Sequence, residues 1–231
     1  MKHIGIAGVT IPGSLLCIDT IVAESYKHFG LDSGKHPRIT YTNPSLSEID
    51  PAIINKDWSK VAVDLLDSIK ILDNAGVDFV IIPSNSPHYA IDEVKERSPL
   101  PIISIIDVTV AECVRRGFKK VGILGVSVTM SDGLYVKPLR DNGIEPFTPS
   151  KEEQKEINDL IYQEIINGKP TATTVTKMKE FIQRLKDNGC DAFIAGCTEI
   201  PVVIKDEIES PLPFADTTRL IAQAAFTESI H

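Results

Sequence analysis

Two short polar segments of this 231-residue chain contain residue types that could do acid–base chemistry. Cys197-Thr198-Glu199 follows an apolar run, and so does Ser84-Asn85-Ser86. Each segment precedes a predicted helix, whose free N–H groups can bind a carboxylate and favour a thiolate. The predicted chemistry is therefore the binding of a carboxylate beside an ionisable thiol, with Cys197 as the most reactive side chain.

The elements that must position these segments alternate between strand and helix. Six apolar runs predict strands, at 4–9, 38–42, 78–83, 102–106, 120–124 and 192–195. Apolar periodicity predicts eight helices, at 14–30 with Ser14 as its cap, 58–75, 89–97, 108–116, 130–142, 152–168, 171–188 and 200–208. Strands that alternate with helices indicate an α/β fold with parallel sheets buried on both faces.

An internal repeat divides this pattern into two halves. Residues 2–9 match 119–126, 76–81 match 189–194, and 98–101 match 210–213, at spacings of 117, 113 and 112 residues. The repeat predicts two pseudo-symmetric, Rossmann-like halves, a first domain of 1–115 plus 210–231 and a second of 116–209. It places Ser84 opposite Cys197 at the carboxyl ends of equivalent strands, and we expect an active site in the cleft between the halves.

Several motifs resemble those of the cofactor-independent aspartate/glutamate racemases and their hydantoin-racemase relatives. Gly196-Cys197-Thr198-Glu199 resembles the family's G-C-T-E, and Ser84-Asn85-Ser86-Pro87-His88 is similar to its C-N-T-x-H, with serine replacing cysteine and threonine. The segment 124–130 resembles its L-G-T-x-x-T-M loop, and 213–218 its closing D-T-T turn. The resemblance covers essentially the whole chain in order.

The resemblance implies an isomerase that needs no cofactor or metal, in which two cysteines flank the substrate Cα. Cys197 would be the proton-transferring thiol, and Ser84, whose hydroxyl is far less acidic, would take the place of the other. Asn85, Ser86 and Thr198 would bind the substrate carboxylate, and Glu199 would be a further substrate-binding residue. The implied reaction is proton abstraction and return on L-aspartate or L-glutamate, with an L-preferring or one-sided enzyme because the second cysteine serves the L-enantiomer.

Other positions depart from the family pattern. Gly8-Val9-Thr10-Ile11 replaces G-G-M-S, and Val126 replaces the first threonine of the middle loop. In 43–49, which is similar to H-P-S-I-P-D-R, Ile49 stands in place of the arginine that would hold a side-chain carboxylate, and Lys169 could supply part of that charge. Thr10, Asn43, Thr129 and Lys169 are accordingly further candidate substrate-binding residues.

Alternative interpretations remain open at this point. The loss of one thiol also fits a single-cysteine decarboxylase or lyase of the same superfamily, and Ser84 with Val126 fits a catalytically silent amino-acid-binding homologue. Ser84 could be only a helix N-cap, and His88 could be only a packed side chain. Cys17, Cys113 and Cys190 fall within helix or strand patterns, which predicts buried, inert thiols.

Composition excludes other classes of partner. A net charge of −8 and a pI near 5.2, without a basic stripe, argue against nucleic acid. The apolar runs are too short to span a membrane, no secretory signal is seen, and no metal-site spacing of cysteine and histidine occurs. We therefore expect a cytoplasmic protein that binds a small amino acid or related carboxylate and, like its relatives, forms a homodimer.

Overall fold

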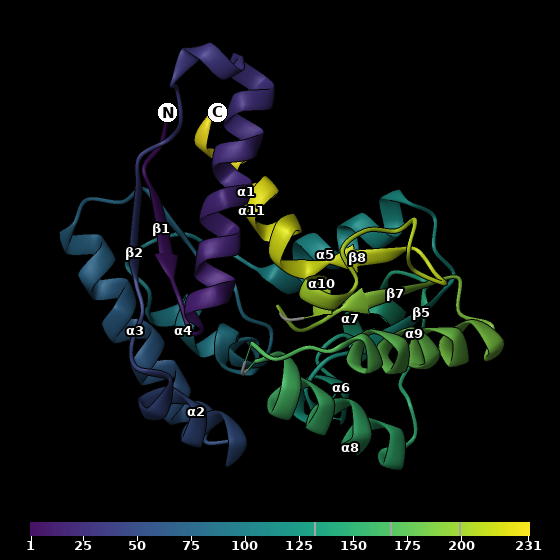
Figure 1. Cartoon of the computed structure of the whole chain (residues 1–231). Helices are drawn as coiled ribbons and strands as arrows, with labels where there is room; N and C mark the ends of the chain where they lie inside the picture. The colour runs from purple at the N-terminus through teal and green to yellow at the C-terminus, as the bar shows by residue number, and fades with distance from the viewer. Residues whose placement is uncertain (132, 167, 199) are drawn as a thin grey trace. The chain divides into compact units, whose positions relative to one another are not determined.

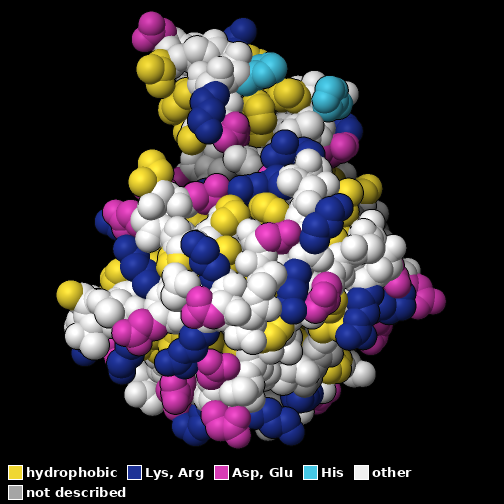
Figure 2. All heavy atoms as spheres, turned by 90° about the vertical axis from the view of Figure 1, so that its right-hand side faces the viewer, with side chains coloured by type: hydrophobic (Ala, Val, Ile, Leu, Met, Phe, Trp, Pro, Cys, Tyr) yellow, Lys and Arg dark blue, Asp and Glu magenta, His cyan; other side chains and the backbone are white. Residues whose placement is uncertain are grey.

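The computed structural model describes residues 1–131, 133–166, 168–198 and 200–231 (Figure 1). Its contacts divide the chain into two units, Met1–Val108 with Thr218–His231, and Thr109–Thr217. In the described ranges, no helix is both long and apolar enough to cross a membrane. On the face shown in Figure 2, basic and acidic side chains are interspersed, and no basic patch forms there.

The first unit is built on a parallel sheet of four strands in the order β2-β1-β3-β4. The strands are β1 (Ile4–Ala7), β2 (Ile39–Thr42), β3 (Phe79–Ile81) and β4 (Ile102–Ile103). The helical segments that follow them are α1 (Ile11–Phe29), η1 (Leu31–Ser33), α2 (Leu46–Ile54), α3 (Trp58–Asn74), η2 (Ser86–Ala90), α4 (Ile91–Arg97) and α5 (Ile105–Arg115). Every residue of β1 and β3 is buried, as expected for strands covered on both faces.

The second unit repeats this topology with the order β6-β5-β7-β8, again all parallel. Its strands are β5 (Lys120–Leu124), β6 (Glu145–Phe147), β7 (Ala192–Ala195) and β8 (Phe214–Asp216). Its helical segments are α6 (Ser127–Ser131), α7 (Val136–Asp141), α8 (Lys151–Leu160) with a π-helical continuation η3 (Ile161–Ile165), α9 (Ala172–Asp187) and α10 (Ile200–Val203). Helix α11 (Thr217–Ser229) ends the chain. The predicted α/β class with parallel sheets is confirmed.

The duplication extends to the register of the strands and to single hydrogen bonds. Ile4 pairs with Phe79, and Val121 with Ala192, at the spacings of 117 and 113 residues found in the sequence. The N–H of Asp78 donates to the His3 carbonyl (2.8 Å), and that of Asp191 to the Lys120 carbonyl (2.9 Å). The Asp78 carboxylate also accepts the N–H of His3, just before β1, and the Asp191 carboxylate accepts those of Lys119 and Lys120 at the start of β5.

Two glycines allow the same close packing in each half. A side chain added at Gly5 would lie 3.3 Å from Leu72 Cδ1, and one at Gly122 only 2.5 Å from Leu185 Cδ1. Both leucines are buried on the long helix that precedes the third strand of its sheet. The helix can approach the first strand closely because no side chain intervenes.

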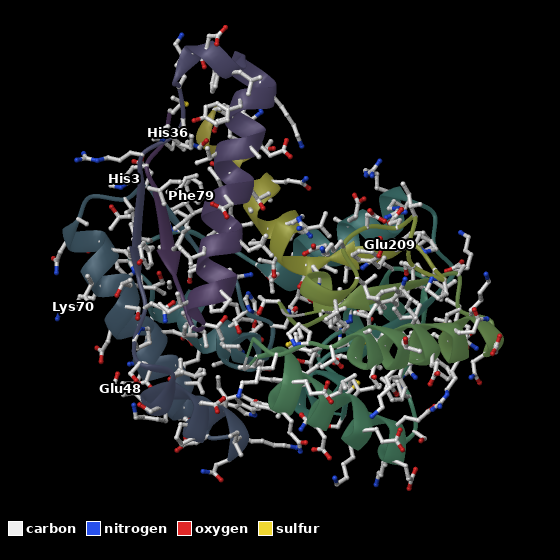
Figure 3. All side chains as sticks on the ribbon, in the orientation of Figure 1. His3, His36, Glu48, Lys70, Phe79 and Glu209 are labelled. Carbon is white, nitrogen blue, oxygen red and sulfur yellow. The ribbon has the colours of Figure 1, made fainter. Side chains whose placement is uncertain are left out.

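His3 ties three segments of the first unit together near the amino end of β1 (Figure 3). Its Nδ1 lies 3.0 Å from the Gly76 carbonyl and its Nε2 2.9 Å from Thr40 Oγ1. A carbonyl only accepts, so Nδ1 carries the proton and Nε2 accepts from the threonine hydroxyl. The imidazole thus joins β1 to β2 and to the turn before β3.

The structure divides the chain differently from the boundaries expected at 115/116 and 209/210. β8 is hydrogen-bonded to β7, so residues 214–216 belong to the second unit. The body of α5 groups with the second unit and that of α11 with the first. In each half, therefore, the helix after the fourth strand begins in one unit and continues in the other.

Local signals explain where elements differ from the sequence prediction. Helix α1 begins at Ile11 because Thr10, not Ser14, caps it and accepts the Gly13 N–H (3.3 Å). The helix expected at 130–142 is two helices, separated near Gly133, whose φ of 80° is incompatible with an α-helix. The one expected at 200–208 ends at Val203, because the Asp206 carboxylate accepts the N–H groups of Ile208 and Glu209 (both 3.0 Å).

An ion pair covers the outer edge of β8. Arg116 donates to both Glu207 oxygens (2.6 and 3.0 Å) and to the Phe214 carbonyl (3.1 Å), while Glu207 accepts the Phe214 N–H (3.0 Å). Unpaired backbone groups at a sheet edge invite association with other chains. The pair therefore satisfies backbone groups that would otherwise be open at this edge.

We expect Glu207→Ala to lower the free energy of unfolding by about 1 kcal/mol, because it removes a partly exposed ion pair and leaves the Phe214 N–H without its acceptor. The hydrogen bonds from Arg116 lower the pKa of Glu207, so its contribution is present at neutral pH and is lost as the pH falls through that lowered pKa. Urea denaturation checks this, with Glu209→Ala as the matched control (Figure 3). Equal effects of the two substitutions would contradict the assignment.

Candidate active site

The turn after β3 places Ser84 at the carboxyl end of the first sheet. The Ser84 N–H donates to the Ile82 carbonyl (2.8 Å), which makes the chain turn sharply after the strand. Asn85, not Ser84, is the N-cap residue of η2, so the proposed capping role of Ser84 is wrong. Asn85 and Ser86 are buried, whereas Ser84 is half-buried and presents its side chain partly to solvent.

Two further predicted binding residues of this unit hold the backbone together. Asn43 Oδ1 accepts from the Ser14 hydroxyl (3.0 Å), and its Nδ2 lies 3.3 Å from the Val9 carbonyl and 3.0 Å from that of Pro44. A side chain at Gly8 would meet both Asn43 and Ser14 at 2.3 Å. Asn43 thus braces the ends of β1 and β2, and Thr10 caps α1. Ser14, predicted as the helix cap, instead donates a hydrogen bond to Asn43.

The equivalent turn after β7 positions Cys197 in the second unit. A side chain at Gly196 would lie 2.9 Å from the Leu124 carbonyl, and one at Gly125 2.9 Å from the Gly196 carbonyl. Only glycines allow the ends of β5 and β7 to approach this closely. Buried Thr129 packs its methyl group against Gly196, and buried Thr198 follows Cys197. These residues gather at the carboxyl end of the second sheet.

Exposure separates Cys197 from the other three cysteines. Cys17, Cys113 and Cys190 are buried, whereas Cys197 is half-buried beside the core of the second unit. Burial raises the pKa of Cys113 to about 12 and that of Cys190 to about 11, so both thiols stay protonated at neutral pH. Cys17 donates its S–H toward the Thr218 carbonyl (3.5 Å). Cys197 is the thiol whose exposure suits chemistry.

His88 is a neutral, buried link rather than a solvent-facing base. Its Nδ1 lies 2.8 Å from the Ser84 carbonyl, and its Nε2 accepts the Ile105 N–H (3.2 Å). Burial lowers the pKa of His88 from about 6.5 to about 4; Lys95 acts in the same direction, and the Ser84 hydrogen bond and Asp107 act against it. His88 therefore joins the Ser84 turn to the start of α5.

This burial predicts a pH-dependent stability. The unfolded chain takes up a proton at His88 below about pH 6.5 and the folded chain only below about 4, so stability is complete above 6.5 and falls as the pH drops toward 4. The loss should amount to about 3 kcal/mol. Unfolding free energies of wild type and His88→Gln between pH 8 and 4 check this, and the variant should lack this part of the slope. Parallel curves would contradict it.

The remaining predicted positions belong to other segments of the chain or lie outside the described residues. Lys169 is exposed, and its N–H donates to the Glu164 carbonyl (2.9 Å) just after the π-helical turn. Ile49 is buried in the core of the first unit, so it does not line a binding surface. Glu199 lies outside the described residues.

One residue of the D-T-T turn has a structural role that the motif did not indicate. The Thr217 hydroxyl, at the start of α11, donates to the carbonyl of Ala195 at the end of β7 (3.0 Å). It thereby connects the helix to the strand that carries Cys197. The repeat is the sequence signal that could have indicated this role, because the match of 98–101 with 210–213 makes β8, directly before Thr217, the equivalent of β4.

Comparisons with known proteins agree with this architecture. The broad specificity amino-acid racemase RacX of Bacillus subtilis is 26% identical over 209 residues, covering 90% of this chain and 88% of RacX. An aspartate racemase homologue from Pyrococcus horikoshii superposes with a TM-score of 0.82 at 27% identity over the full length of both chains. The aspartate racemase of Picrophilus torridus gives 0.74 at 25% identity, covering 99% and 94%.

A family model described as Asp/Glu/hydantoin racemase matches residues 6–225, nearly the whole chain. The match spans both duplicated halves and includes the Ser84 and Cys197 turns. The chain therefore belongs to the Asp/Glu/hydantoin racemase family.

Proposed function

We propose that this protein is a cofactor-independent amino-acid racemase that exchanges the α-proton of L-aspartate or L-glutamate by means of Cys197 and Ser84. The observation that carries the proposal is the equivalence of these residues: Ser84 lies five residues after Phe79 and Cys197 five residues after Ala192, the first residues of the equivalent strands β3 and β7. Racemisation needs one proton carrier on each face of the substrate carbon, and a duplicated pair meets that need.

In the proposed reaction the Cys197 thiolate removes the α-proton of the L-enantiomer. The C–H electron pair stays on the substrate and spreads into its carboxylate, so donors that hold this group lower the barrier. Asn85 and Ser86 in the first unit, and Thr198 in the second, are buried at the strand ends and are suited to that role. A proton delivered to the other face from the Ser84 hydroxyl gives the D-enantiomer. The Ser84 alkoxide then takes a proton from water, and the hydroxide so formed removes the proton from the Cys197 thiol, which restores the starting state.

The serine makes the proposed enzyme one-sided. A hydroxyl can donate a proton, but its conjugate alkoxide is too basic to persist near neutral pH without an adjacent general base. The nearest imidazole, His88, holds its proton on the nitrogen facing the Ser84 carbonyl and points its other nitrogen at the Ile105 N–H. His88 therefore offers no free basic nitrogen to Ser84, and removal of a proton from the D-enantiomer should be slow.

A dicarboxylic substrate is the favoured choice within this proposal. The names of the relatives refer to aspartate, glutamate and broad specificity amino-acid racemases. Buried Ile49 cannot contribute a charge, and Lys169 is the cation assigned to the substrate's second carboxylate. Replacing Lys169 by methionine should then raise KM for aspartate more than KM for alanine.

Deuterium incorporation tests the proposed function. L-Aspartate, L-glutamate and L-alanine are each incubated with the protein in deuterated water, and the α-proton signal and enantiomer ratio are followed. Exchange accompanied by D-enantiomer supports racemisation. Absence of both with every amino acid would overturn it.

A single-thiol lyase is the second candidate, and Ser84 is the observation that favours it. Such an enzyme needs only one proton donor, because loss of carbon dioxide leaves the electron pair that Cys197 then protonates. An α-substituted malonate incubated with the protein distinguishes the two: carbon dioxide release without amino-acid exchange supports the lyase and excludes the racemase.

A further inference from the structure

His88 makes two hydrogen bonds that fix its protonation and connect two segments. The Ile105 N–H can only donate, so Nε2 must accept, and Nδ1 must carry the proton that goes to the Ser84 carbonyl. The side chain is 3% exposed, and burial keeps it neutral at physiological pH. A neutral imidazole that cannot rotate without losing both partners is a rigid spacer between the Ser84 turn and α5.

We propose that His88 is a positioning residue that fixes the main chain of the Ser84-Asn85-Ser86 turn through the Ser84 carbonyl, and so aims both the Ser84 hydroxyl and the carboxylate-binding groups. This inference rests on the proposed function and adds a residue to it. His88 acts on the main chain and touches no reacting atom.

The second half of the duplicated fold makes the equivalent connection with a different residue. Pro201 stands at the position equivalent to His88, so no imidazole link exists there. Instead Thr217, the equivalent of Ile105, reaches the end of β7 directly, its hydroxyl donating to the Ala195 carbonyl two residues before Cys197. Both halves thus attach the first residue of the helix after the fourth strand to the strand end that carries a predicted catalytic residue.

The Ser84 turn follows directly on the end of a strand. β3 ends at Ile81, and two short-range hydrogen bonds shape the turn, from the Ser84 N–H to the Ile82 carbonyl and from the His88 N–H to the Asn85 carbonyl. The helical segment that follows is a 3-10 helix whose cap makes no side-chain hydrogen bond. His88 connects this turn to the start of α5, the helix that follows the neighbouring strand β4.

Two substitutions separate the two bonds of His88. In His88→Asn the side-chain Nδ2 can replace Nδ1 as donor to Ser84, whereas the acceptor for Ile105 is lost; in His88→Gln the Oε1 can replace Nε2, whereas the Ser84 bond is lost. We expect His88→Asn to unfold more easily but to keep kcat within about threefold. His88→Gln should keep most of its thermal stability near pH 8 but lose kcat by at least tenfold, with a smaller change in KM.

The measurements are thermal unfolding, deuterium exchange of L-aspartate with kcat and KM separated, and nitrogen-15 NMR of the imidazole. Loss of kcat in proportion to loss of stability in both variants would overturn the positioning role, and so would an Nε2-protonated imidazole in the wild type. If the wild type exchanges no substrate, the proposed function fails. The positioning role is then tested by carboxylate binding alone, and it fails if His88→Asn and His88→Gln weaken that binding equally.

Discussion

Cys197→Ala is expected to abolish α-proton exchange of L-aspartate and L-glutamate, with a fall in rate of at least about a thousandfold. The estimate follows because a positioned acid or base contributes roughly 10²- to 10⁴-fold to a proton transfer, and the hydroxyl of the neighbouring Thr198 is far less acidic than a thiol. Cys197 is half-buried, so removal of its sulfur should leave the fold intact. Binding of the substrate, measured by calorimetry, should weaken little because the carboxylate-binding groups remain.

Cys113→Ala is the matched control for this experiment. Burial raises the pKa of Cys113 to about 12, so its thiol takes no part in proton transfer at neutral pH, and it too lies in the second unit. We expect activity close to wild type with a modest decrease in stability from the cavity. Substantial exchange by Cys197→Ala would show that another group removes the proton.

The duplicated sheet could be predicted from sequence because buried parallel strands are continuous apolar runs. β7 has the predicted bounds, and β5 also matches. β6 and β8 were missed, since each has only three residues and contains or follows proline. The repeat nevertheless indicates β8, because this strand lies 112 residues after β4, which is the spacing of the Ser-Pro-Leu-Pro match.

Long amphipathic helices were predicted more successfully than short ones. The bounds of α3 and α9 agree with the predicted ones to within one residue at each end, because the apolar periodicity of these helices continues for more than four turns. Helix α2 was missed although Ser45 and Glu48 form a capping pair, in which the Ser45 N–H donates to the Glu48 carboxylate (3.3 Å). Pro51 within the helix interrupts its apolar periodicity, so the sequence pattern did not indicate a helix there.

The candidate site could be located from sequence, but the roles of its residues could not all be assigned. Ser84 and Cys197 follow from strand ends, which are fixed by topology. Asn43 and Thr10 have the residue types of binding groups, yet in the structure Asn43 braces the backbone and Thr10 caps α1. The role of Asn43 depends on its contact with Ser14 of α1, a segment distant in sequence, and a local motif contains no record of such a contact.

Ser84→Cys is expected to turn a one-sided enzyme into a two-sided one. A thiol has an ordinary pKa of about 8.5, so a measurable fraction is ionised near neutral pH, whereas a serine hydroxyl is not. The new thiolate could remove the α-proton of D-aspartate. Because enantiomers have equal free energies, kcat/KM for racemisation should then rise at least about tenfold in both directions. Chiral chromatography of reactions started from each enantiomer measures the two rates separately.

Ser84→Ala completes this comparison, because the position is half-buried and tolerates a small side chain of either type. If the hydroxyl delivers the proton that forms the D-enantiomer, alanine should remove D-product formation while Cys197 still exchanges the L-enantiomer with solvent deuterium. Retention of configuration with continued exchange is the signature of a single working carrier. Unchanged D-product in Ser84→Ala, together with no gain in Ser84→Cys, would mean that the proton reaches the second face from water or another residue, and Ser84 would lose its role.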